Sequence, residues 1–166
     1  STLTRDMEKI AGALENAVEV NRFFVAEQRG DVVGAIACTD CTGRAMRLDN
    51  ANFRRHLGLV RGELGARILK PQFMSRLEYP ATTGYIEFVA VSEKARRRGI
   101  ATKLVEGVIA ATRYAEFVLE VVGTNTPARD CYANVGFAEI KRVKEKFGRI
   151  KGFRERIDMR YERPAD

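Results

Sequence analysis

A strand, a basic turn and an amphipathic helix follow one another in the middle of this 166-residue chain, and this succession constrains the fold most strongly. Residues 84–91 read GYIEFVAV, a run of aromatic and β-branched residues that predicts a strand. Residues 95–99 read ARRRG, and residues 100–113 then place apolar side chains at helical spacing. The first backbone N–H groups of a helix have no partner within it. Positive charge and a glycine at that point therefore predict an anion-binding site.

The remaining patterns predict one mixed α/β domain over residues 1–166, built around a largely antiparallel sheet with flanking helices. The other elements expected are a helix from residue 4 to about 20, a hairpin of 22–28 and 32–39, two short helices within 48–70 broken near Gly58 or Gly62, a strand over 117–122, a helix over 126–135, and a final strand pair of 137–145 and 153–161. In the short helix over 126–135, Thr126 is expected to cap the helix and Gly136 to end it.

The formal net charge is +7, which favours anionic partners. Much of the excess lies within residues 141–164, where a solvated strand pair is expected. Nucleic acid is not the expected partner, because no basic motif interleaved with aromatic residues and no recognised binding helix stands out. No apolar run is long enough for a membrane span and no signal-peptide pattern is present, so the cytoplasm is the expected compartment.

Three cysteines, Cys38, Cys41 and Cys131, are too few for a disulfide framework. Cys38 and Cys41 form a C-x-x-C pattern, but a zinc site needs four ligands and the single histidine is His56. We therefore expect no metal site, and interpret the thiols as small buried or loop side chains.

Residue types in the basic turn suit phosphate. Gly99 lets a phosphate approach the backbone without meeting a Cβ, and the arginines supply forked donors. Ala101 keeps the first helical turn small, and Thr102 offers a hydroxyl. Neither the G-x-G-x-x-G dinucleotide pattern nor the G-x-x-x-x-G-K-[ST] pattern is present, so the phosphates are expected to belong to another carrier.

Two motifs resemble the GNAT family of N-acetyltransferases. The family's turn [Q/R]-x-x-G-x-[G/A] is matched by residues 96–101, RRRGIA, after the family's fourth strand. Its N-x-x-A-x-x-x-Y-x-x-x-G-F pattern, after the fifth strand, is matched by residues 125–137, NTPARDCYANVGF. The resemblance covers roughly residues 20–163, although only one helix, and not the family's first strand, precedes the hairpin.

The resemblance implies acetyl-CoA as cosubstrate and a sheet whose fourth and fifth strands, here 84–91 and 117–122, splay apart. The diphosphate of acetyl-CoA would lie against the amides of residues 97–102, and its pantetheine arm would pair with the strand over 84–91. A backbone N–H near Val89 would face the thioester carbonyl. The cofactor-binding residues implied are Val89, Ala90, Val91, Arg96, Arg97, Arg98, Gly99, Ile100, Ala101, Thr102 and Asn125.

The resemblance also implies catalytic roles. Tyr132 would be the general acid for the leaving sulfur; the alternative is a core aromatic residue packed on Ala128. For the base we propose Glu87, which regular strand alternation would place on one face with Val89. Glu87 as a surface or ion-paired residue, Glu120 as the base, and an ordered water remain alternatives.

The sequence therefore predicts an acetyl-CoA-dependent N-acetyltransferase acting on an unidentified primary amine by direct ternary-complex transfer. A non-catalytic acyl-CoA-binding module is the alternative, and a homodimer is left open. Residues 39–84 exceed a simple hairpin connection, so we expect them to contribute to the acceptor side.

Overall fold

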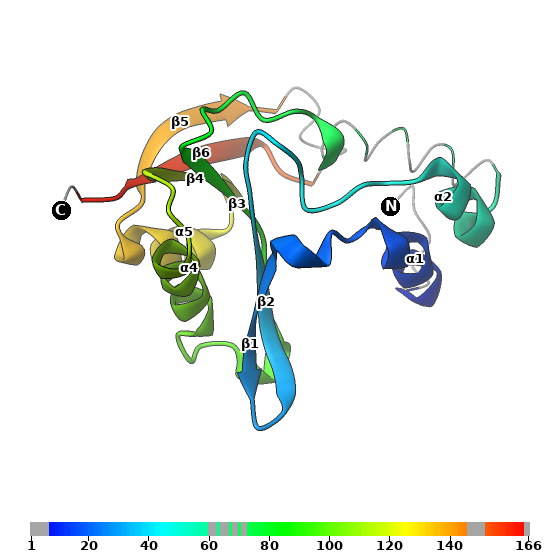
Figure 1. Cartoon of the computed structure of the whole chain (residues 1–166), viewed down its shortest axis with the longest axis horizontal. Coiled ribbons are helices and arrows are strands. Elements are labelled where there is room, and N and C mark those ends of the chain that lie inside the picture. The colour runs from blue at the N-terminus through cyan, green and yellow to red at the C-terminus, as the bar shows by residue number, and fades with distance from the viewer. Residues whose placement is uncertain are drawn as a thin grey trace. The chain divides into compact units, whose positions relative to one another are not determined.

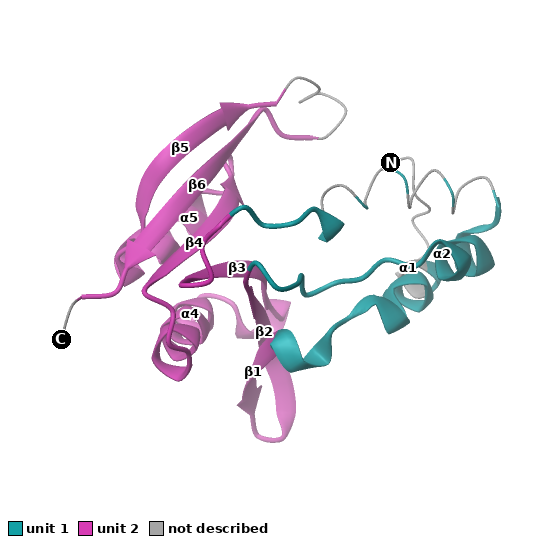
Figure 2. Cartoon of the chain, turned by 45° about the horizontal axis from the view of Figure 1, so that its top comes forward, with its two compact units in different colours: residues 1–22, 41–78 teal, residues 23–40, 79–166 magenta. Residues whose placement is uncertain are grey.

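The computed structural model describes residues 7–59, 63, 67, 70, 73–145 and 152–164. The chain divides into two compact units, each built from two stretches of sequence (Figure 2). Unit 1 comprises residues 1–22 and 41–78, and unit 2 comprises residues 23–40 and 79–166. That the whole chain forms a single N-acetyltransferase domain stays a prediction. Within the described residues, no helix is long and apolar enough to span a bilayer.

The described residues of unit 2 form one sheet of six strands in the order β1-β2-β3-β4-β6-β5 (Figure 1). The strands are β1 (Phe23–Gln28), β2 (Asp31–Thr39), β3 (Thr83–Val91), β4 (Glu116–Val122), β5 (Ala138–Lys144) and β6 (Glu155–Glu162). Only β3 and β4 pair in parallel, and the other neighbours are antiparallel. The prediction of a mixed, mostly antiparallel sheet is confirmed.

Two helices of unit 2, α4 (Ile100–Ala111) and α5 (Thr126–Val135), pack against each other, and α4 also packs on strands β1, β2 and β3. The fully buried Val105 and Val108 of α4 join Phe117 and Leu119 of β4 in one core cluster. Apolar residues of α4 recur every three or four positions, so burial of that stripe fixes the helix on the sheet.

The cap of α5 differs from the prediction. Asn125, not Thr126, is the N-cap, and its side-chain oxygen accepts a hydrogen bond from the Ala128 N–H at 3.3 Å. Thr126 is the first helical residue, so it cannot cap the helix. Gly136 ends the helix as predicted, with a left-handed φ of 110°.

Unit 1 begins with α1 (Met7–Leu14), followed by two 3-10 turns, η1 (Glu15–Ala17) and η2 (Val20–Arg22). The predicted helix to about residue 20 is therefore too long. Val18 forms an isolated antiparallel bridge with Met46, and the next N–H, of Glu19, donates to the Ala45 carbonyl at 2.9 Å. This pairing with a distant segment replaces the helical hydrogen bonds.

The second helix of unit 1, α2 (Asn50–Leu57), ends at Gly58, whose φ is 82°. Asp49 caps its start by accepting hydrogen bonds from the N–H groups of Ala51 and Asn52. Gly58 is one of the two predicted break points. The second predicted helix of this stretch falls largely outside the described residues.

Candidate active site

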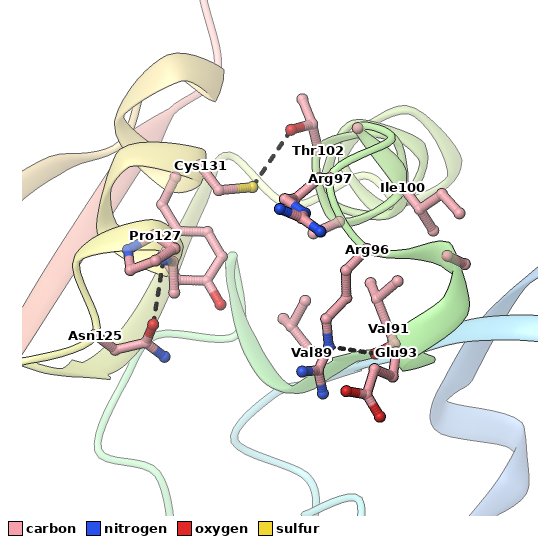
Figure 3. Close-up of a pocket in the computed structure, with 15 residues that line it drawn as sticks. Val89, Val91, Glu93, Arg96, Arg97, Ile100, Thr102, Asn125, Pro127 and Cys131 are labelled. Atoms are coloured by element: carbon pink, nitrogen blue, oxygen red, sulfur yellow. Dashed lines mark hydrogen bonds between the residues drawn. The ribbon is translucent and has the colours of Figure 1, made fainter.

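A cavity of about 760 Å³ in unit 2 lies at the start of helices α4 and α5 (Figure 3). Its lining residues are Val89, Val91, Glu93, Ala95, Arg96, Arg97, Gly99, Ile100, Ala101, Thr102, Asn125, Pro127, Ala128, Cys131 and Tyr132. All predicted cofactor-binding residues except Ala90 and Arg98 line it. The end of β3 and the basic turn that follows it are thereby brought together with α5, which lies much further along the chain.

The parallel pair β3–β4 opens beside this cavity. Their ladder joins residues 83–86 of β3 to residues 116–119 of β4 and ends at the pair Ile86–Leu119. β3 continues to Val91 and β4 to Val122 without further pairing between them. The β3–β4 ladder thus ends at Ile86, and a strand edge that parts from its neighbour in this way favours an incoming strand-like partner.

A β-bulge in β3 changes which face its residues occupy. Glu87 of β3 lies opposite Ala37 of β2, and Ala90 lies opposite Ala35. Three steps along β3 thus match two steps along β2, so β3 holds one extra residue. Phe88 lies within this bulge and has a left-handed φ of 56°. Alternation is therefore interrupted after Glu87.

Our expectation that Glu87 and Val89 share a face is wrong for this reason. Val89 packs against the core cluster containing Ile86, on the side of the helices, and lines the cavity with Val91. Glu87 pairs with Ala37 and lies on the other face of the sheet, along with Ala90.

The basic turn leaves backbone donors available at the start of α4. Gly99 is the N-cap residue with a φ of 72°, and no side chain caps the helix. A Cβ built on Gly99 would have no heavy atom within 4 Å, so the space beside this backbone is open. Arg97 also has a left-handed φ, 60°. A left-handed conformation costs a non-glycine residue about 1–2 kcal/mol, and such strain is characteristic of functional turns.

Side chains around the turn make specific contacts that Figure 3 shows. Arg96 folds back so that its Nε donates to the Val91 carbonyl at 3.3 Å. A carbonyl has two lone pairs, so Val91 keeps the capacity to accept another hydrogen bond. Across the cavity, the Thr102 hydroxyl and the Cys131 thiol lie 3.3 Å apart and share a hydrogen bond.

Tyr132 combines a core position with access to the cavity. Its side chain is only 8% exposed and its ring lies 6.2 Å from that of Phe137. Burial raises the pKa of Tyr132 to about 12, with a smaller contribution from Cys131. The hydroxyl therefore keeps its proton at every ordinary pH. Core packing and cavity lining coexist here, rather than excluding each other.

The two candidate bases lie immediately after the last β3–β4 pair, on the sheet face opposite the cavity. Glu87 accepts a hydrogen bond from the Thr39 hydroxyl at 3.1 Å. Glu120 accepts one from Arg156 at 2.5 Å. Burial raises the pKa of Glu120, and the Arg156 guanidinium opposes this effect. Neither carboxylate lines the cavity itself, but both flank the point where the strands part.

Two tyrosines lie near these carboxylates on the same face. The rings of Tyr79 and Tyr85 stack with centroids 6.0 Å apart. Burial raises the pKa of Tyr79, and the charges of Asp158 and Glu120 raise it further. This face therefore carries aromatic rings and carboxylates beside the gap, together with Arg156 and Arg160, which pair with Glu120 and Glu116.

Sequence reasoning missed several cavity residues. Pro127, Ala128 and Cys131 line the cavity with Tyr132, and none was proposed as a site residue. Positions 127, 128, 131 and 132 follow helical spacing and so share one face of α5. Tyr132 and this spacing together could have predicted the set.

The cavity suits an acyl carrier such as acetyl-CoA. Exposed arginines and uncapped amides at the turn suit a diphosphate, and the open space beside Gly99 admits one closely. Val89, Pro127 and Ala128 give an apolar wall for an uncharged arm. The β3 edge, which parts from β4 after Ile86, suits the amides of such an arm.

A mixed sheet whose parallel pair opens beside a basic glycine turn is the fold of the acyl-CoA N-acyltransferases. The sequence profile described as the Acetyltransferase (GNAT) family matches residues 4–137. The chain belongs to the GNAT acetyltransferase family, and this membership supports acetyl transfer as its activity.

Individual proteins agree with this assignment. An N-alpha-acetyltransferase of Sulfurisphaera tokodaii is 32% identical over 123 residues, which cover 72% of this chain and 58% of that protein. This chain thus spans a little over half of that relative's length. Two solved structures share the fold: an N-acetyltransferase from Staphylococcus aureus Mu50 (TM-score 0.62, 20% identity, 96% of this chain and 82% of that one) and the ribosomal-protein-S18-alanine N-acetyltransferase from Escherichia coli (TM-score 0.57, 14% identity, 99% and 93%).

Proposed function

We propose that the chain transfers the acetyl group of acetyl-CoA to a primary amine, directly and within a ternary complex. The observation that carries this proposal is the opening of β3 from β4 after the Ile86–Leu119 pair. Tyr132 lines the cavity on one side of the sheet, and two carboxylates flank the opening on the other. Donor and acceptor would thus approach from opposite faces and meet in the gap.

Binding is assigned to the turn and the strand edge. The amides of residues 97–102 would hold the diphosphate, with Arg96 and Arg97 adding charge. The β3 backbone from Val89 to Val91 would pair with the pantetheine arm, and Asn125 would contact that arm. When bound, acetyl-CoA supplies an activated thioester.

Three groups of the chain would act on the transfer. Glu87 takes a proton from the ammonium of the acceptor, which frees the nitrogen lone pair for attack. The backbone N–H near Val89 faces the carbonyl oxygen, where negative charge develops. The new N–C bond forms as the C–S bond breaks, Tyr132 donates its proton to the departing sulfur, and the second proton lost by the nitrogen restores the phenol. The products are then the amide and the CoA thiol, and Glu87 releases the first proton to solvent.

The raised pKa of Tyr132 limits how readily its hydroxyl would donate a proton to the departing sulfur. A phenol of pKa about 12 is a weaker acid than a thiol of about 8.5. Proton donation must therefore be coupled to breaking of the C–S bond, and hydrogen bonding to the sulfur is the larger part of the role.

For the acceptor we propose the α-amine of a polypeptide. Two of the similar proteins carry names that denote acetylation at such an amine. An α-amine has a pKa of about 8, against about 10.4 for lysine, and so needs less help to lose its proton. The carboxylates at the gap also suit an ammonium group.

The test is release of free thiol from acetyl-CoA with two peptides. One has a free α-amine and no lysine, and the other has a blocked N-terminus and one lysine. We expect turnover with the first and little with the second. No release with any amine would favour a non-catalytic acyl-CoA-binding module, and lysine preference would overturn the acceptor assignment.

Tyr132→Phe links the activity to the cavity. We expect the variant to lose about tenfold or more in kcat while binding acetyl-CoA within about twofold of the wild type. Tyr161→Phe is the matched control, because Tyr161 packs against the same core cluster and does not line the cavity. Unchanged turnover in Tyr132→Phe would remove Tyr132 from the mechanism.

A further inference from the structure

A second hollow in unit 2, of about 420 Å³, lies beside the basic turn. It is lined by the tip of the β1–β2 hairpin and by the segment from Ser92 to Arg98. The acetyl-CoA cavity and this hollow share a single lining residue, Ala95, whose side chain is 3% exposed. Ala95 therefore forms part of the wall between them. A volume of this size is within the range of small-ligand sites.

The turn divides its positive charges between the two spaces. Arg96 and Arg97 line the acetyl-CoA cavity, but Arg98 lines the second hollow. Lys94 also lines the hollow, and its neighbour Glu93 lines the cavity. Arg98 was predicted to bind the cofactor, but it lines the hollow and not the cavity.

Three cations from separate segments gather at the hollow: Arg29, Lys94 and Arg98. All three side chains are exposed, and in the described part of the chain none takes part in an ion pair. Asp31 is the one carboxylate among the lining residues, so they carry a formal excess of two positive charges. Like charges held around one space repel, and a bound anion would relieve this repulsion.

The hairpin holds Arg29 at the hollow in a strained conformation. Arg29 has a φ of 57° and is followed by Gly30 with a φ of 85°, between the paired residues Gln28 and Asp31. Positive φ at both central residues is the pattern of a tight hairpin turn, in which asparagine and glycine are favoured. Arginine at such a position is unusual, and a strained residue beside a basic hollow indicates a role for its side chain.

We propose that this hollow is a second anion site that binds a phosphate monoester. Arginine pairs with phosphate through two parallel hydrogen bonds, and lysine acts as a point charge. Ser92, which also lines the hollow, offers a neutral hydroxyl donor. The phosphate has two sources: the 3′-phosphate of acetyl-CoA itself, or a separate phosphorylated small molecule. Only the first source rests on the proposed function.

The test compares two triple variants of the full chain. Arg29→Gly, Lys94→Gln and Arg98→Gln remove the cations of the hollow, and glycine suits the positive φ at position 29. Arg113→Gln, Lys141→Gln and Lys144→Gln remove the same charge from residues that line neither space. Inorganic phosphate is the probe, titrated by calorimetry.

We expect saturable phosphate binding by the wild type and the control, and about tenfold or more weakening in the hollow variant. Equal binding by both triple variants, whether strong or weak, would overturn the proposal, as would absence of binding to the wild type.

Acetyl-CoA and its 3′-dephospho form then distinguish the sources. If the first source holds, the wild type binds acetyl-CoA more tightly than the dephospho form, and the hollow variant binds both alike. If the second holds, the two forms bind the wild type alike, and inorganic phosphate still binds at saturating acetyl-CoA. Two results together would overturn the proposal. The hollow variant would still bind acetyl-CoA more tightly than the dephospho form, and saturating acetyl-CoA would prevent inorganic phosphate from binding the wild type. Peptide acetylation, measured separately, tests the proposed function itself.

Discussion

At the scale of single residues, Tyr132 shows how one side chain serves both the core and the site. Its ring belongs to the buried cluster, and its burial is the main reason that the pKa of its hydroxyl is raised to about 12. The same desolvation that holds the ring in place therefore keeps the hydroxyl protonated. Substitution by phenylalanine removes the donor and leaves the packing nearly unchanged.

This pKa makes the pH dependence of catalysis testable. A group with a pKa of about 12 remains protonated up to about pH 11, so Tyr132 cannot limit the rate below that pH. We expect kcat with a peptide α-amine to rise with pH as the amine loses its proton, with no falling limb below about pH 10. A falling limb near pH 8 or 9 that disappears in Tyr132→Phe would contradict this account.

The base can be assigned by paired substitutions at the gap. We expect Glu87→Gln to lower kcat/KM by about a hundredfold, because a glutamine cannot accept the proton of the ammonium. Glu120→Gln is the matched control, since Glu120 follows the last β3–β4 pair in the other strand and is held by Arg156. Steady-state kinetics with the same peptide measures both. A larger fall in Glu120→Gln would transfer the role to Glu120, and a small fall in both would favour water.

At the scale of elements, the helix α5 depends on Asn125, which both caps the helix and lines the cavity. Asn125→Ala should lower the free energy of unfolding by about 1 kcal/mol, because the Ala128 N–H loses its partner. Asn125→Asp should retain the cap, and Thr126→Ala should have little effect because Thr126 is not the N-cap. Urea unfolding of the three variants measures this, and equal loss in Asn125→Ala and Thr126→Ala would contradict it.

The aspartate variant also separates the cap from the proposed ligand contact. Its carboxylate can cap α5, but it places a negative charge beside a phosphate-bearing ligand. Stability close to wild type with weaker acetyl-CoA binding is the expected combination. Unchanged acetyl-CoA binding in Asn125→Asp would argue against contact between Asn125 and the cofactor arm.

The elements that could be predicted from sequence are those formed by local patterns. The turn at Gly99, helix α5 and the final strand pair were predicted to within a few residues, because periodicity, a proline and two glycines mark them. The bulge at Phe88 could not be predicted, because an extra residue in a strand leaves no mark in its apolar character. This bulge is what separates Val89 from Glu87.

At the scale of the whole molecule, the sequence gives no direct view of contacts between distant segments. The bridge of Val18 to Met46 follows the 3-10 turn that ends at Ala17, and no local pattern predicts this bridge. The predicted site was found largely from motifs, yet its acceptor face was not. The order β3-β4-β6 brings the carboxylates beside the gap, and Tyr79, in the segment before β3, stacks on Tyr85.

The positions of the charged side chains also differ from what the net charge of the chain indicates. The net charge of +7 suggests anionic partners everywhere. The structure gathers arginines at the turn and the second hollow, and places the carboxylates Glu87, Glu120 and Asp158 on the face opposite the cavity, where Arg156 pairs with Glu120. A phosphate-bearing donor and an ammonium acceptor would each meet the opposite charge.

Calorimetric titration of the full chain with acetyl-CoA, CoA and ATP tests the central claim most directly. The account predicts that acetyl-CoA and CoA each bind at one site per chain and that ATP binds far more weakly, because only the first two carry a pantetheine arm for the open edge of β3. Absence of acetyl-CoA binding, or ATP binding of equal strength, would contradict it.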